Sequence, residues 1–184
     1  MFFRYLLDML QLILSPRRGW EDIAIDNASP RRLLHAGFLP FIILTALTCL
    51  PGLWYHSDAT LPGVIERAIA CFVKYLAGYY LALFFFSLYM PSCTGGEVSP
   101  NKNATFIIYS LGLIAVFNIL TNLLPMVPDM LYLLPVYLIF IMWRGITYME
   151  VKFNGVMTFM ILNILTVVIT PFLLQYLFNL IIPS

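Results

Sequence analysis

Five long apolar stretches occupy most of this chain of 184 residues. A helix needs about 20 consecutive apolar residues to cross the hydrocarbon core of a bilayer, and each stretch is about that long or longer. The sequence therefore predicts an all-α fold of the polytopic membrane class, with a transmembrane domain at residues 33–182. The five transmembrane helices are expected at about residues 33–54, 64–90, 104–124, 130–146 and 155–182.

The composition agrees with a membrane protein and limits what else the chain can contain. Hydrophobic residues make up 61% of it and charged residues only 10%. A soluble domain of this length could not cover so much apolar surface, and five spans leave no room for a separate catalytic domain. The formal net charge of +1 offers no basic face, so nucleic acid is not an expected partner.

The basic residues are distributed unevenly between the two sides of the predicted membrane. The loops at about residues 55–63 and 125–129 and the C-terminal tail contain no Lys or Arg. Cytoplasmic loops of membrane proteins carry an excess of Lys and Arg, so we expect the N-terminus in the cytoplasm and the C-terminus outside. Eight of the ten basic residues lie on the predicted cytoplasmic side: Arg4, Arg17, Arg18, Arg31, Arg32, Lys102, Arg144 and Lys152.

Residues 1–32 are predicted to form a cytoplasmic segment in the membrane interface. Its first part is apolar except at Arg4, Asp8 and Gln11, whose spacing puts them on one stripe of a helix. This part rises only about 20 Å as a helix, which is too short to span a bilayer. We therefore expect an amphipathic interfacial helix at residues 2–14 and a short helix at residues 16–26.

A short sequence repeat marks the starts of two helices. Ser15-Pro16-Arg17-Arg18 recurs as Ser29-Pro30-Arg31-Arg32, and Ser before Pro is typical of a helix start. Arg pairs are electrostatically unfavourable at a helix N-terminus, and anionic headgroups of the cytoplasmic leaflet are the simplest compensation. The candidate contacts to headgroups or partner proteins are Arg17, Arg18, Trp20, Arg31, Arg32, Gly95, Gly96 and Glu97.

Several polar side chains fall inside the predicted spans, and Lys74 is the deepest cation. It lies about 15 Å into the second span, where an isolated cation costs at least about 3 kcal/mol. Arg67 and Gly78 share its helical face, which should turn away from lipid. We expect its hydrogen-bond partner to be a polar group of the third or fifth span, with Asn118 as the first choice. The candidate intramembrane polar cluster comprises Arg67, Lys74, Asn118, Thr121, Asn122, Asp129, Thr166 and Thr170.

Three interpretations of Lys74 remain open from the sequence. It can join helices through hydrogen bonds, it can line a water-filled cavity that attracts anions, or its amine can reach the outer interface. A dry and fully paired Lys favours a packing role. A wet cavity that is continuous with one side of the membrane favours transport.

No pattern of catalytic, cofactor-binding or metal-binding residues occurs in the sequence. The two His residues have no ligand neighbours at suitable spacing, and no nucleophile, zinc or paired-carboxylate motif is present. Cys49 and Cys71 are expected at similar depth near the outer side, where they could form a disulfide or serve as small packing residues. We therefore expect no enzyme, no cofactor and no metal.

Three features together resemble the Yip family, the Rab-interacting five-span membrane proteins and their prokaryotic relatives. One is the segment 14–21, in which Pro16 precedes Trp20 ahead of the first span. The second is Gly95-Gly96-Glu97-Val98-Ser99, which leads into a span through Tyr109-Ser110. The third is the five-span layout with a cytoplasmic N-terminus. Eukaryotic members have a longer cytoplasmic N-terminal region, so the resemblance is to a prokaryotic-type member and implies the bacterial inner membrane.

The resemblance implies a non-enzymatic integral membrane protein that organises lipids or other membrane proteins, often as a homo-oligomer. This is the leading functional hypothesis, with the helix bundle and the cytoplasmic loops as contact surfaces. The alternative is a small transporter or channel with a polar cavity around Lys74. An intramembrane enzyme ranks third, because no residue pattern supports one.

Overall fold

The computed structural model describes residues 1–55, 60–96, 99–124 and 134–181, and these residues form helices and connecting turns without strands. The elements, in chain order, are α1 (Phe2–Leu14), α2 (Pro16–Asp26), α3 (Pro30–Leu33), the π-helix η1 (Leu34–Phe38), α4 (Leu39–Leu47), α5 (Gly52–Tyr55), α6 (Leu61–Thr94), α7 (Pro100–Leu123), α9 (Leu134–Arg144), the 3₁₀-helix η2 (Phe153–Gly155), α10 (Val156–Asn163), the π-helix η3 (Ile164–Ile169) and α11 (Thr170–Ile181).

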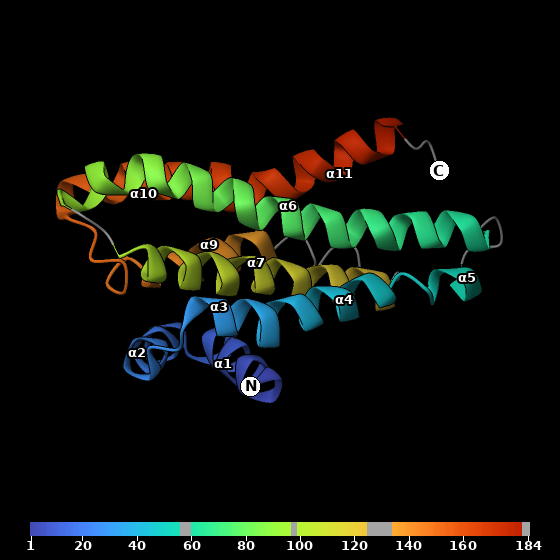
Figure 1. Cartoon of the computed structure of the whole chain (residues 1–184), viewed down its shortest axis with the longest axis horizontal. Coiled ribbons are helices and arrows are strands. Elements are labelled where there is room, and N and C mark those ends of the chain that lie inside the picture. Colours follow the sequence, from blue (N-terminus) through green and yellow to red (C-terminus); the bar gives the residue numbers. More distant parts are fainter. Residues whose placement is uncertain (56–59, 97–98, 125–133, 182–184) are drawn as a thin grey trace.

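Four helical stretches among the described residues are long and apolar enough to cross a membrane, as expected of an integral membrane protein. They lie lengthwise in one bundle and alternate in direction along the chain (Figure 1). They run over Pro30–Trp54, Leu61–Thr94, Pro100–Leu123 and Phe153–Leu180.

The fifth expected span, at 130–146, stays a prediction. Its described part is α9, whose 11 residues rise only about 16 Å. Residues 125–133 lie outside the described part of the chain.

The helices begin and end at different residues from the predicted spans, because residues that favour helix starts and stops lie outside the apolar centres. Leu61–Thr94 starts before the expected residue 64, after Thr60, whose hydroxyl accepts a hydrogen bond from the Gly63 backbone N–H. It continues past residue 90 until Gly95, whose φ of 69° suits a residue without a side chain. Pro100 likewise starts α7 four residues before the expected position.

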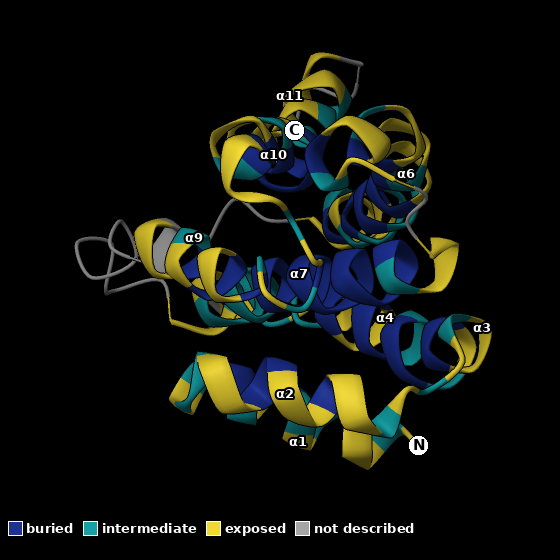
Figure 2. Ribbon diagram, turned by 90° about the vertical axis from the view of Figure 1, so that its left-hand side faces the viewer, coloured by how far each residue is buried: buried dark blue, intermediate teal, exposed yellow. Residues whose placement is uncertain are grey.

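Helix α7 is the centre of the bundle. Every residue from Asn103 to Ala115 is buried, and the ribbon there is dark blue (Figure 2). A helix that is apolar all round is stable only when other helices surround it. The helices α1, α4, α6 and α9 all contact α7.

Helices α1 and α2 lie side by side across the long helices (Figures 1 and 2). Tyr5 faces the bundle and its ring stacks on Tyr109, with ring centroids 5.3 Å apart. Gly112 allows this approach, because a Cβ there would collide with the Tyr5 hydroxyl and the Met9 sulfur. The opposite side of α1 exposes large apolar side chains: Phe3, Leu7, Leu10 and Leu14. Its location in a membrane interface stays a prediction.

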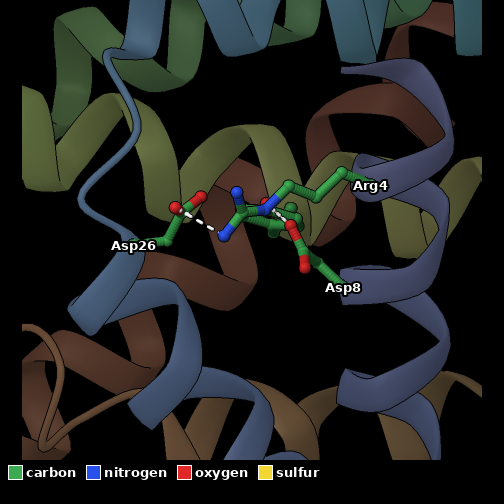
Figure 3. A network of polar contacts seen from close by, with 4 residues as sticks. Arg4, Asp8 and Asp26 are labelled. Carbon is green, nitrogen blue, oxygen red and sulfur yellow. Dashed lines mark hydrogen bonds and ion pairs between the residues drawn. The ribbon is translucent and has the colours of Figure 1, made fainter.

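The polar stripe of α1 lies against α2 and α7. Arg4 forms an ion pair of 2.5 Å with Asp26, and Gln11 donates a hydrogen bond to Asp22 (Figure 3 shows Arg4, Asp8 and Asp26). Asp8 accepts a hydrogen bond of 2.7 Å from the Tyr109 hydroxyl. Burial raises the pKa of Asp8, while the Tyr109 hydrogen bond and the Arg4 charge act in the opposite direction.

Trp20, a candidate contact to headgroups or partner proteins, is packed mainly inside the protein. Only 2% of it is exposed, and its indole N–H donates a hydrogen bond of 3.0 Å to the Ile141 carbonyl oxygen. The ring lies between Phe106 and Tyr148, with centroid distances of 5.0 and 5.3 Å. An amphipathic ring next to a crowded helix bundle buries its apolar body and keeps one hydrogen bond.

Candidate functional site

A cavity of about 600 Å³ opens in the half of the bundle that contains the start of α6 and the end of α7. Side chains from the turn after α4 and from α6, α7, α9, η3 and α11 line it. The lining residues are Cys49, Arg67, Cys71, Lys74, Tyr75, Ile114, Phe117, Asn118, Thr121, Asn122, Leu138, Val168, Pro171, Phe172 and Gln175.

The break in the last span helps to form this cavity. The π-helix Ile164–Ile169 is followed by Pro171, which has no N–H to continue the helical hydrogen bonds. Helix α11 consequently leaves the direction of α10 and diverges from α6 in Figure 1. Val168, Pro171 and Gln175 then face the cavity.

Lys74 is the buried cation of the cavity, about 20 Å along α6 from Leu61. It is 6% exposed, and its ammonium donates a hydrogen bond of 3.0 Å to the side-chain oxygen of Gln175. Its nitrogen lies 5.2 Å from the centroid of the Tyr75 ring, within the range of a cation–π interaction. Among the described residues, no carboxylate comes within 4.0 Å of it.

The partner of Lys74 therefore lies in the last span, one of the two spans expected to supply it, but it is Gln175 and not Asn118. Asn118 lines the same cavity, but the hydrogen bond from the lysine goes to Gln175 of the last span. An ammonium has three N–H donors, so Lys74 keeps donor capacity beyond the Gln175 bond.

Arg67 adds a second cation to the cavity. It is exposed and lies two turns before Lys74 on the same helix, nearer the end of the bundle. The described lining contains no Asp or Glu. Two cations without a carboxylate in the described lining give this cavity a positive potential that favours anions.

Polar side chains of α7 complete the lining. The Asn122 side-chain amide donates to the Thr48 hydroxyl at 2.9 Å and to the Cys49 sulfur at 3.5 Å. Thr121 donates to the Asn118 backbone carbonyl at 2.9 Å. The sequence placed these three α7 residues in one cluster with Arg67 and Lys74, and the structure brings all five residues to the same cavity.

Two residues of the expected cluster lie elsewhere, and a third cannot be placed. The Thr166 hydroxyl is 3.3 Å from the Tyr89 hydroxyl and donates to the Leu162 carbonyl at 2.7 Å. The Thr170 hydroxyl donates at 3.3 Å to the carbonyl of Leu165, a neighbour within the same span. Both hydroxyls thus serve helix–helix or local contacts. Asp129 lies outside the described residues.

Gln175 lines the cavity and bonds Lys74, although the sequence did not predict this residue as part of the cluster. It is an amide within the apolar run Pro171–Leu177, one turn after the proline. A single polar side chain just after a helix kink is the signal that could have identified it, because kinked helices leave polar groups to line cavities. Cys49 and Cys71, expected at similar depth, also both line the cavity as free thiols.

The other expected contact residues lie at the opposite end of the bundle, which we call the basic end because it carries Arg31, Arg32, Lys102, Arg144 and Lys152. Arg17, Arg18, Arg31 and Arg32 are exposed there. Gly95 packs against the Lys152 side chain, and Gly96 is exposed beside it. Glu97 lies outside the described residues. Residues 1–55, 60–96, 99–124 and 134–181 hold no group of His, Cys, Asp or Glu that could bind a metal ion.

The side chains that line the cavity carry positive charges and hydrogen-bonding groups. Comparison of the chain with protein-family models, with curated proteins and with solved structures finds no match.

Proposed function

We propose that this integral membrane protein is non-enzymatic and binds a small anionic solute in the cavity around Lys74, as a small transporter or channel does. The observation that supports this function is the position of Lys74, which is only 6% exposed and lines a cavity of about 600 Å³. Its hydrogen-bond partner there is the Gln175 amide. Small-molecule sites in proteins commonly have volumes of about 300–1,000 Å³.

The free-energy cost of placing the Lys74 charge inside a membrane favours a binding role over a packing role. A cation inside a membrane costs at least about 3 kcal/mol unless water, a partner or an anion compensates it. A helix-packing lysine would be expected to use its donors within the protein, whereas Lys74 donates to Gln175 and borders open volume. The cavity exceeds by far the roughly 10–15 Å³ that one water needs.

The proposed orientation places the basic end in the cytoplasm. Cytoplasmic loops of membrane proteins carry an excess of Lys and Arg, and Arg31, Lys102 and Lys152 all lie at one end of the bundle. The cavity with Arg67 then lies in the outer half of the membrane. The bacterial inner membrane, which the Yip resemblance implies, is the proposed location.

Anion binding can be measured by the stability that it adds to the folded state. A ligand at 100 times its dissociation constant adds about 2.7 kcal/mol to the free energy of unfolding. The probes are chloride, phosphate and succinate, added separately to the purified protein in lipid nanodiscs. At least one probe should raise the unfolding temperature of the unmodified protein but not of Lys74→Met.

The matched control is Lys102→Met, which removes a cation that pairs with Glu150 at 2.5 Å outside the cavity. This variant should keep the full anion response. An equal response in Lys74→Met and Lys102→Met would refute the proposed function. Flux of the stabilising anion into proteoliposomes then distinguishes a transporter from a membrane protein that binds without transport.

A Yip-type organiser is the second candidate function. It is favoured by the position of Trp20, from the segment that carries the resemblance, which anchors α2 to α7 and α9. Helix α6 also exposes Tyr80, Phe84 and Leu88, one apolar stripe at spacings of four residues, toward lipid or a partner helix. Cross-linking from cysteines introduced at Phe84 in native membranes tests it, since an organiser should yield a specific homo-oligomer or partner adduct.

A further inference from the structure

A second cavity, of about 540 Å³, lies at the basic end and has no place in the proposed solute site. It is formed between α2, the end of α9 with the turn that follows it, and the start of the last span. Trp20 and Tyr148 line it, and residues from these three parts of the chain complete its wall.

The cavity contains two arginines with spare hydrogen-bond donors. Arg144 is exposed, its guanidinium carbon lies 5.1 Å from the centroid of the Phe140 ring, and it has no ion pair among the described residues. Arg17 uses its Nε–H for a hydrogen bond of 3.1 Å to Glu21. The terminal N–H groups of both guanidinium groups remain available for an incoming anion.

The charge of the lining matches a monovalent or divalent oxyanion. Arg17 and Arg144 contribute two positive charges and Glu21 one negative charge, the carboxylate among the described lining residues. Arginine binds phosphate through paired N–H groups with a geometry that lysine cannot match. The pair therefore favours a phosphate group.

The apolar part of the lining favours a phospholipid over a free phosphate ion as the ligand. Phe153 is 93% exposed and lies at the start of the last apolar helical stretch, and Trp143 is 52% exposed and lies at the end of α9. Exposed aromatic rings at such positions prefer the headgroup level of a bilayer, next to glycerol and acyl chains. A free phosphate ion would gain nothing from these rings.

We propose that the cavity between α2 and the α9–η2 turn is a binding site for the phosphate of an anionic phospholipid, with Arg17 and Arg144 on the phosphate and Trp143 and Phe153 on the acyl-chain side. Basic pockets between transmembrane helices are a known way to hold anionic headgroups. The site keeps α2 and the last span attached to the same lipid molecule.

Tryptophan fluorescence tests this site with brominated lipids, which quench rings that they contact. Two of the three tryptophans line the cavity, and Trp54→Phe removes the third, at the other end of the bundle. In nanodiscs of neutral phosphatidylcholine, a few brominated phosphatidylglycerol molecules should quench this variant more strongly than brominated phosphatidylcholine does. Arg17→Gln with Arg144→Gln should weaken the phosphatidylglycerol effect about tenfold or more for each arginine.

Matched controls distinguish a site from general surface charge. Arg31→Gln with Arg32→Gln removes the same charge from exposed residues of the basic end and should keep the preference. Glu21→Gln should strengthen it. The proposal is overturned if both double variants lose the preference equally, or if Glu21→Gln leaves it unchanged.

A competition separates the two sources of phosphate. Excess inorganic phosphate should leave the quenching by brominated phosphatidylglycerol intact, because it cannot replace the contacts of Trp143 and Phe153. Complete displacement by inorganic phosphate would show a free-anion site and overturn the lipid assignment. Lys74→Met should not affect any of these results, so failure here and failure of the proposed solute site are distinguishable.

Discussion

The Tyr109 hydroxyl donates a hydrogen bond of 2.7 Å to a carboxylate oxygen of Asp8, residues separated by 101 positions in the chain. This bond joins the crosswise helix α1 to the buried middle of α7 (Figure 3 shows the surroundings of Asp8). It gives a half-buried carboxyl group one strong partner next to the Arg4–Asp26 ion pair. The stability of this attachment therefore depends on whether Asp8 is protonated.

The first prediction concerns the pH dependence of this attachment. Burial raises the pKa of Asp8 above its ordinary value of 3.8, so the folded chain holds this proton more tightly than the unfolded chain. The resulting stability is fully present below pH 3.8 and is lost as the pH rises through the folded-state pKa. Asp8→Asn should remove this contribution and make the unfolding temperature less pH-dependent as the pH rises above 3.8.

Tyr109→Phe keeps the Asp8 carboxyl group but removes its hydrogen-bond donor. The Tyr109 hydrogen bond lowers the Asp8 pKa, so its removal should raise that pKa further. The loss of stability should then extend to higher pH than in the unmodified protein. Identical pH profiles for all three proteins would contradict the role of Asp8.

The second prediction concerns the close approach of α1 to α7. Gly112→Ala puts a methyl group against the Tyr5 hydroxyl and the Met9 sulfur, and overpacking of this kind costs about 1–3 kcal/mol. Gly78→Ala is the control, since its Cβ would be 3.8 Å from Pro171, an ordinary contact. Thermal unfolding in detergent should show a clear loss for Gly112→Ala alone. Equal effects of both changes would argue against the tight α1–α7 contact.

The third prediction concerns Asn163, which is fully buried in α10. Within the part of the chain that the structure describes, neither its side-chain oxygen nor its nitrogen has a hydrogen-bond partner. Such an unpaired amide costs about 1–3 kcal/mol, so Asn163→Leu should raise the unfolding temperature. Asn122→Leu should lower it, because that amide bonds Thr48 and Cys49. A destabilised Asn163→Leu would mean that the amide has a partner such as a buried water.

The fourth prediction concerns topology. Single cysteines at positions 58 and 184, in a variant with the three native cysteines replaced, should react with a membrane-impermeant reagent on intact cells. A cysteine at Ser99, the residue directly before α7, should react only after permeabilisation. The reverse labelling pattern would invert the proposed orientation and place the Lys74 cavity toward the cytoplasm.

The sequence predicts much of the helical fold because its signals are local. These signals are the length of the apolar stretches and the Ser-Pro or Gly residues at helix ends. Helices were expected at residues 2–14 and 16–26, and the structure has helices at Phe2–Leu14 and Pro16–Asp26. Four of the predicted spans correspond to helices of sufficient length and hydropathy among the described residues. The interfacial placement of the two N-terminal helices stays a prediction, because it depends on a bilayer. The fifth span stays a prediction because part of it lies outside the described residues.

The candidate site was predicted only in part, because the last span is not a regular α-helix. A period of 3.6 residues puts Thr166 and Thr170 in line with the cavity. The π-helix Ile164–Ile169 inserts wider turns, which rotate the following side chains relative to that expectation. Gln175 then meets Lys74, and the two threonines bond elsewhere. Residues of α6 and α7, which are regular helices, needed no such correction.

The most direct test of the central claim is anomalous diffraction from crystals grown in sodium bromide. The account predicts a bromide peak in contact with the Lys74 ammonium, within the cavity that Gln175 and Asn118 line. The peak should be absent from crystals of Lys74→Met and present in those of Lys102→Met. A cavity without bromide around Lys74, in crystals that show bromide at other cations, would contradict the proposal that this cavity binds anions.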